Sequence, residues 1–164
     1  MWFRRMTHRI LIADDQPTLR SLLRRELERT GSFEVCGEAL DGVDAVAKAE
    51  RLRPDLIILD LRMPVMNGLE AASVIERVLP SVPIVLFTLT DTPEVKLQAA
   101  RSGIVQVISK GEGVKALLAA IESALEKEKR TEPPAVTGER SAIADADTQP
   151  ALPAGAAKNP AESC

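Results

Sequence analysis

The chain has 164 residues, of which 45% are apolar, and a formal net charge of −3 at pH 7. This composition indicates a globular protein, and no stretch approaches the roughly 18–20 consecutive apolar residues of a membrane-spanning helix. One histidine and two cysteines argue against a His-rich metal site and a disulfide framework, and the N-terminus has no apolar signal region, so we expect a cytoplasmic protein without a membrane contact.

Charge is distributed unevenly along the chain. The last 34 residues hold two of the 21 basic and five of the 24 acidic residues, which leaves 19 of each sign in residues 1–130. The chain also has only one tryptophan, three phenylalanines and no tyrosine. A neutral body with so few aromatic rings lacks the basic patch and the stacking surfaces of nucleic-acid-binding proteins, so we expect no direct nucleic-acid binding.

Short apolar runs alternate with helical periodicity over residues 8–130. The strands are predicted, in chain order, at residues 10–13, 33–37, 56–59, 84–87 and 105–109. A helix is predicted after each strand, with start signals at Pro17, Asp41 and Thr92 and end signals at Gly31 and Gly103. Because the strands are continuous apolar runs in a βα alternation, they predict a doubly wound α/β fold, a parallel sheet covered on both faces.

The character of the sequence changes after the last predicted helix. From residue 131 onward the chain holds five prolines and nine alanines, and it has too few large apolar side chains to offset the entropy lost on ordering. We therefore expect an N-terminal extension at residues 1–7, one folded domain at residues 8–130 and a disordered Pro/Ala-rich tail at residues 131–164.

Polar side chains follow four of the predicted strands. Asp14 and Asp15 follow the first, Asp60 the third, Thr88 the fourth and Lys110 the fifth. Each residue alone would suit a turn or a solvated surface. The carboxyl ends of parallel strands lie at one edge of the sheet, where open α/β folds place their sites, so together these residues predict a functional site.

The chemistry of this set favours a divalent metal ion and a phosphoryl group. Two carboxylates about 4 Å apart repel each other by roughly 4 kcal/mol at an effective dielectric near 20. Mg²⁺ binds such oxygen ligands, whereas zinc and copper prefer His and Cys ligands, which this set does not include. Asp60 would then act as a nucleophile towards phosphorus, with Lys110 neutralising charge on the transferred group and Thr88 donating a hydrogen bond to it.

These residues resemble the receiver domain of two-component response regulators, of the chemotaxis-regulator kind. The resemblance is carried by residues 12–15 (IADD), 60–70 (DLRMPVMNGLE), Thr88 and 109–110 (SK), and it covers nearly the whole predicted domain. It implies a flavodoxin-like (βα)5 fold with strand order 2-1-3-4-5. It also implies a Mg²⁺-dependent phosphorylation of Asp60 by a histidine kinase or a phosphotransfer protein.

The resemblance assigns a role to each residue. Asp60 would be the phosphoacceptor and a metal ligand. Asp15 and the backbone carbonyl of Arg62 would bind Mg²⁺ directly, and Asp14 through a water. Thr88 and Lys110 would respond to the phosphoryl group.

Three further positions concern switching and phosphate lifetime. Arg62 and Thr90 would tune how long the phosphate persists. The family's aromatic switch position is occupied here by Val107, which has no ring to move.

The predicted function is that of a stand-alone receiver that catalyses only its own phosphorylation and dephosphorylation. It would bind a downstream protein or a second copy of itself through its fourth helix, fifth strand and fifth helix. One alternative is a pseudo-receiver that binds partners without phosphorylation, which is favoured by Val107 and by Leu89, a large residue where the family usually has a small one. Another is an aspartate-nucleophile phosphatase of the haloacid dehalogenase kind, which Arg62 argues against because those enzymes place a second Asp there.

Overall fold

The computed structural model describes residues 7–131, and these residues form five strands and five α-helices in strict alternation. The strands are β1 (His8–Ala13), β2 (Phe33–Ala39), β3 (Leu56–Leu59), β4 (Ile84–Thr88) and β5 (Ile104–Ser109). The helices are α1 (Pro17–Arg29), α2 (Gly42–Leu52), α3 (Gly68–Val78), α4 (Pro93–Arg101) and α5 (Gly113–Thr131), with a short 3₁₀ helix η1 (Lys110–Glu112) before α5. Across this part of the chain, no helix is both long and apolar enough to span a membrane.

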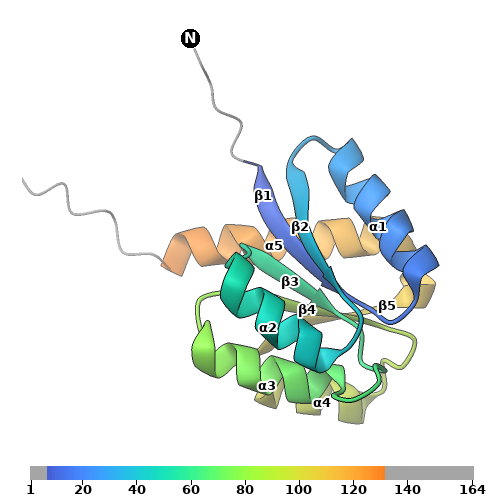
Figure 1. Cartoon of the computed structure of the whole chain (residues 1–164), viewed down its shortest axis with the longest axis vertical. Coiled ribbons are helices and arrows are strands. Elements are labelled where there is room, and N and C mark those ends of the chain that lie inside the picture. Colours follow the sequence, from blue (N-terminus) through green and yellow to red (C-terminus); the bar gives the residue numbers. More distant parts are fainter. Residues whose placement is uncertain (1–6, 132–164) are drawn as a thin grey trace, which may run out of the picture. The chain divides into compact units, whose positions relative to one another are not determined.

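The five strands form one parallel sheet in the order β2-β1-β3-β4-β5 (Figure 1). The doubly wound α/β fold and its strand order are therefore confirmed. The order reverses direction at β1, since the chain first moves outward to β2 and then crosses over to β3. Open α/β sheets bind their ligands beside such a reversal, at the carboxyl ends of the strands.

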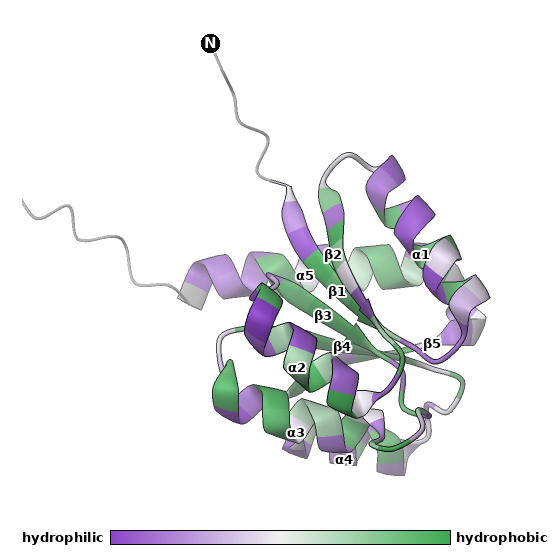
Figure 2. Cartoon of the chain, viewed as in Figure 1, coloured by the Kyte–Doolittle hydropathy of each residue, from purple (hydrophilic) through white to green (hydrophobic). Residues whose placement is uncertain are grey.

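Helices cover both faces of the sheet, and each face has its own apolar core. Successive residues of β1 alternate between the two cores, because side chains of a strand point to opposite faces. Leu11 packs in the core beneath α2, α3 and α4, whereas Ile12 packs in the core beneath α1 and α5. All four residues of β3 are buried, and β3 is green along its length in Figure 2. This burial explains why the strands are continuous apolar runs.

The helix-start signals act as the sequence predicts. The Asp41 side chain accepts a hydrogen bond from the backbone of Asp44, and the Thr92 side chain accepts one from Val95. Pro17 occupies the first turn of α1. The start of α3 has a further cap, in which Asn67 and Glu70 form a reciprocal capping box directly after the loop that follows β3.

Element limits differ slightly from the predicted ones, mainly because polar residues extend the strands. β1 begins at His8 and β2 continues through Glu38 to Ala39. The domain limits predicted at residues 1–7 and 131–164 fall almost entirely outside the described residues, so the extension and the tail stay predictions.

Candidate functional site

The acidic residues come together because β1 and β3 are neighbours in the sheet. Asp14 directly follows β1, and its backbone N–H donates to the carbonyl of Ala39 on β2. Asp60 directly follows β3, and its N–H donates to the carbonyl of Ala13 at 2.8 Å. Oxygen atoms of Asp14, Asp15 and Asp60 lie within 4.8 Å of one another. Asp14 and Asp60 are 2% and 5% exposed, whereas Asp15 faces solvent.

Lys110, which directly follows the edge strand β5, brings a positive charge to this cluster. Its Nζ atom lies 2.7 Å from Oδ2 of Asp14 and 3.3 Å from Oδ1 of Asp60. The lysine side chain is only 10% exposed, so both ion pairs are largely shielded from water. It is held at the start of η1, where Ser109 and Glu112 form a capping box.

Thr88 ends β4 and is fully buried. The sheet register pairs Thr88 with Ser109, so the threonine lies beside the residue that precedes Lys110. The Thr88 hydroxyl oxygen accepts a hydrogen bond from the backbone N–H of Thr90 at 3.2 Å. This bond ties the first residues of the β4–α4 loop to the end of the strand.

The loop between β3 and α3 is fixed by backbone hydrogen bonds at several points. Gly68 donates to the carbonyl of Leu61 at 3.0 Å, and Met66 donates to that of Pro64 at 2.7 Å. The Met66 carbonyl accepts from Gly42 of α2 at 3.0 Å. The turn places Val65 at φ 68°, a left-handed conformation that is strained for a β-branched residue, with its side chain 84% exposed.

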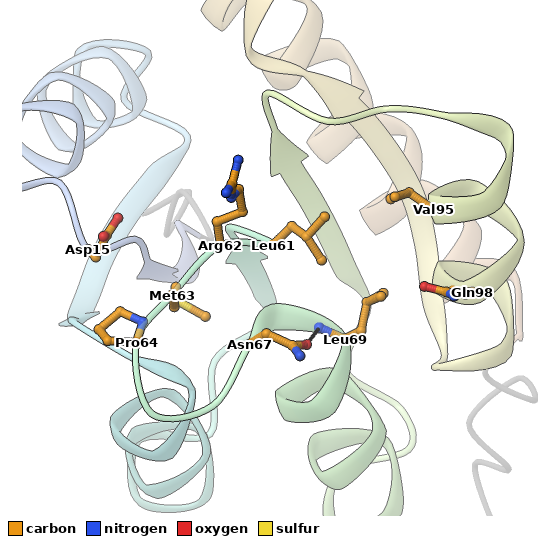
Figure 3. Close-up of a pocket in the computed structure, with 9 residues that line it drawn as sticks. All are labelled: Asp15, Leu61, Arg62, Met63, Pro64, Asn67, Leu69, Val95 and Gln98. Carbon is orange, nitrogen blue, oxygen red and sulfur yellow. Dashed lines mark hydrogen bonds between the residues drawn. The ribbon is translucent and has the colours of Figure 1, made fainter.

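A groove of about 620 Å³ runs from the acidic cluster towards α4 (Figure 3). Asp15 lines one end, and Val95 and Gln98 of α4 line the other, with Arg62 and Leu61 between them. The two residues predicted to tune phosphate lifetime have different surroundings. Arg62 is exposed at the groove, whereas Thr90 is half-buried and its backbone N–H donates to the Thr88 hydroxyl.

The electrostatics of the cluster favour a bound cation. Burial raises the pKa of the Asp60 carboxyl, an effect that Lys110 opposes and the neighbouring Asp14 carboxylate reinforces. Lys110 forms ion pairs with two of the three clustered carboxylates, Asp14 and Asp60, so the cluster keeps negative charge. All the ligand atoms of the cluster are oxygens, which fits the preference of Mg²⁺ and not that of zinc or copper.

Val107 lies in β5 and is half-buried, packed against the core beneath α2, α3 and α4. It therefore fills apolar space within the strand that leads to Lys110.

The family model of the response regulator receiver domain matches residues 10–122. The chain belongs to this family. The matched range begins within β1 and ends within α5, so it includes most of β1, the other four strands and the whole acidic cluster.

Curated relatives share this receiver but are longer proteins. A Bacillus subtilis protein described as the uncharacterized transcriptional regulatory protein YxjL is 38% identical over 116 residues, which cover 71% of this chain and 53% of the relative. A protein-glutamate methylesterase/protein-glutamine glutaminase of Myxococcus xanthus is 42% identical over 103 residues, 62% of this chain and 29% of that enzyme. The chain thus spans between about a third and a half of the length of these two relatives.

Among solved structures, the response regulator domain of Thermotoga maritima CheB has the same fold. It is 28% identical, with a TM-score of 0.67, over 77% of this chain and 99% of that domain. The alignment therefore includes nearly the whole receiver domain of the Thermotoga maritima protein.

One buried side chain beside the acids is absent from the sequence-based site. Arg20 of α1 is 8% exposed, and it donates to the carbonyl oxygen of Asp14. The helical spacing indicates that Arg20 is buried. It lies three residues before Leu23 and seven before Leu27, which form the buried face of α1. An arginine on an apolar face needs a partner, and that partner cannot be read from α1 alone.

Proposed function

We propose that this receiver accepts a phosphoryl group on Asp60 in a Mg²⁺-dependent reaction, and that phosphorylation changes which partner it binds. The observation that carries the proposal is the position of the Asp60 carboxylate. It is almost completely buried, lies 3.3 Å from the Lys110 ammonium and shares a cluster of oxygens with Asp14 and Asp15.

In the transfer step, an oxygen of the Asp60 carboxylate forms a bond to phosphorus. The bond from phosphorus to the imidazole nitrogen of the donor's phosphohistidine breaks, and its electron pair leaves with the imidazole. The donor would be a sensor histidine kinase or a phosphotransfer protein. A small acyl phosphate serves the same purpose, with its P–O bond as the one that breaks.

Asp15, Asp60 and the backbone carbonyl of Arg62 would hold Mg²⁺, with Asp14 binding through a water. The cation, when bound, supplies positive charge beside the phosphoryl oxygens. Lys110 would move from the carboxylates to a phosphoryl oxygen, and the Thr88 hydroxyl would donate to another. The bond from Thr90 to Thr88 supports a link between this movement and the β4–α4 loop.

The changed surface would include α4, β5 and α5. Leu97 on α4 is 56% exposed and Val105 on β5 is 51% exposed, so apolar area is present there for a downstream protein or a second copy of the chain. Arg62 at the groove and Thr90 beside Thr88 would control how readily water reaches the phosphoryl group. We infer no enzymatic activity beyond self-phosphorylation and self-dephosphorylation.

A phosphorylation-independent pseudo-receiver is the second candidate, because Val107 offers no aromatic ring for the switch. Intact mass measured after treatment with acetyl phosphate and Mg²⁺ separates the two functions. We expect one added phosphoryl group in the wild type and none in Asp60→Asn. No added mass with either acetyl phosphate or a cognate kinase would support the pseudo-receiver and contradict the phosphorylated switch.

A further inference from the structure

Arg20 contacts the backbone of the acid pair from within the protein. Its Nη1 atom donates to the carbonyl oxygen of Asp14 at 2.6 Å, and its Nε atom donates to Oε2 of Glu38 at 3.1 Å. The guanidinium therefore connects α1 to both the end of β1 and the end of β2.

Both the side chain and the backbone carbonyl of Glu38 accept further hydrogen bonds. Its other carboxylate oxygen accepts a hydrogen bond from Nε of Arg24 at 2.7 Å, and its backbone carbonyl accepts one from Nζ of Lys48 on α2. Burial alone would raise the pKa of the Glu38 carboxyl, but the hydrogen bonds from Arg24 and Arg20 outweigh it and lower the pKa. Glu38 therefore stays ionised and balances the charge of Arg20.

The carbonyl that Arg20 holds belongs to the peptide unit between Asp14 and Asp15. A peptide unit is planar, so fixing its oxygen fixes the direction in which the chain leaves Asp14 and enters Asp15. The N–H of Asp14 is fixed separately by Ala39, and its Oδ1 accepts from the backbone of Gln16 at 2.8 Å. Within residues 7–131, the hydrogen bond from Arg20 is the side-chain contact that holds this peptide.

We propose that Arg20 is a positioning residue for the metal site, and that it acts by holding the Asp14–Asp15 peptide while Glu38 balances its charge. This inference rests on the proposed function, since it concerns the same Mg²⁺ ligands. Side chains that orient metal ligands without touching the metal typically change metal affinity by 10- to 100-fold when they are replaced.

Arg24 provides a matched control. It lies one helical turn after Arg20 and binds the same carboxylate, yet its other hydrogen bonds go to Glu28 and to the carbonyl of Val35. Replacing Arg24 therefore removes a comparable ion pair with Glu38 and leaves the bond from Arg20 to Asp14 in place.

The experiment compares Arg20→Met with Arg24→Met by calorimetric titration with Mg²⁺, together with thermal unfolding in EDTA. We expect Arg20→Met to raise the dissociation constant for Mg²⁺ at least ~10-fold and Arg24→Met to change it less than ~2-fold. Arg20→Lys, which keeps the charge but loses the fixed planar set of guanidinium donors, should lie between Arg20→Met and the wild type. Equal effects of the two methionine variants, or an Arg20→Met affinity within ~2-fold of the wild type, would overturn the inference.

If Arg20→Met does not fold, the comparison passes to Arg20→Lys and Arg24→Lys. A loss of Mg²⁺ affinity specific to the Arg20 variant supports the positioning role, and equal affinities contradict it. If the wild type does not bind Mg²⁺, both the proposed function and the role of Arg20 are contradicted. If the wild type binds Mg²⁺ and the Arg20 and Arg24 variants have equal affinities, only the role of Arg20 is contradicted.

Discussion

Gly68 stands directly against the main chain of Asp60. A Cβ atom at Gly68 would overlap the Asp60 carbonyl oxygen and would lie 2.9 Å from the carbonyl carbon, a distance that real Cβ contacts do not reach. The Gly68 N–H also donates to the carbonyl of Leu61 at 3.0 Å. Gly68, the first residue of α3, thus packs directly against the backbone of Asp60, the residue that we propose as phosphoacceptor.

We expect Gly68→Ala to lower the free energy of unfolding by about 2–3 kcal/mol, because the added methyl group must displace backbone that is fixed on both sides. Urea unfolding measures this change. Gly111→Ala is the control, since a Cβ there would meet only the Ser109 hydroxyl at 3.5 Å and should alter stability by less than about 0.5 kcal/mol. Equal losses in both variants would mean that the close approach to Asp60 is unimportant.

Val65 should be a site of stored backbone strain. Its φ of 68° costs a β-branched residue about 1–2 kcal/mol, and its side chain is 84% exposed, so there is little packing to lose. We expect Val65→Asn to raise the free energy of unfolding by about 1 kcal/mol, because asparagine tolerates the left-handed conformation. Val43→Asn tests the same exchange on exposed, regular helix and should be near neutral, so a gain confined to Val65 identifies strain as its source.

Much of this architecture is predictable from local patterns. The apolar runs predict the strands, and the polar residues directly after them predict what gathers at the carboxyl edge, because parallel strands share a direction. The Asp60–Glu70 stretch carries enough specific residues to indicate the family. The left-handed turn at Val65 and the partners of Arg20 could not be predicted in this way. Both depend on contacts between segments that are distant in sequence, such as Gly42 with Met66 and Arg20 with Glu38.

The buried Asp60 carboxyl should make the metal-free protein less stable as the pH rises. Its pKa is raised above the unfolded value of about 3.8, so the folded state binds more protons between the two pKa values. Stability should therefore fall as the pH increases from below 3.8 through the raised folded pKa, and this contribution should be absent in Asp60→Asn. Urea unfolding in EDTA across this range measures the difference, and parallel pH profiles for the two proteins would contradict it.

Glu38 should give a pH dependence of the opposite sign. Its pKa is lowered by Arg24 and Arg20 to below the unfolded value of 4.5, so its contribution is present above that pH and is lost as the pH falls through the folded pKa. We expect Glu38→Gln to cost about 1–2 kcal/mol at pH 7 and progressively less in acid. Unfolding of the two proteins from pH 7 down to pH 3 checks this, and a constant difference over the range would show that the charge of Glu38 is not its source.

The ion pairs of Lys110 have a consequence for how quickly the site can change state. An ammonium group carries three donor hydrogens, and carboxylates separated from it by 96 and 50 positions in the chain both lie within its reach. Lys110 can therefore let go of Asp60 while still holding Asp14. The ammonium group therefore keeps one carboxylate partner throughout such an exchange. The rearrangement avoids the free-energy barrier of leaving a buried cation unpaired.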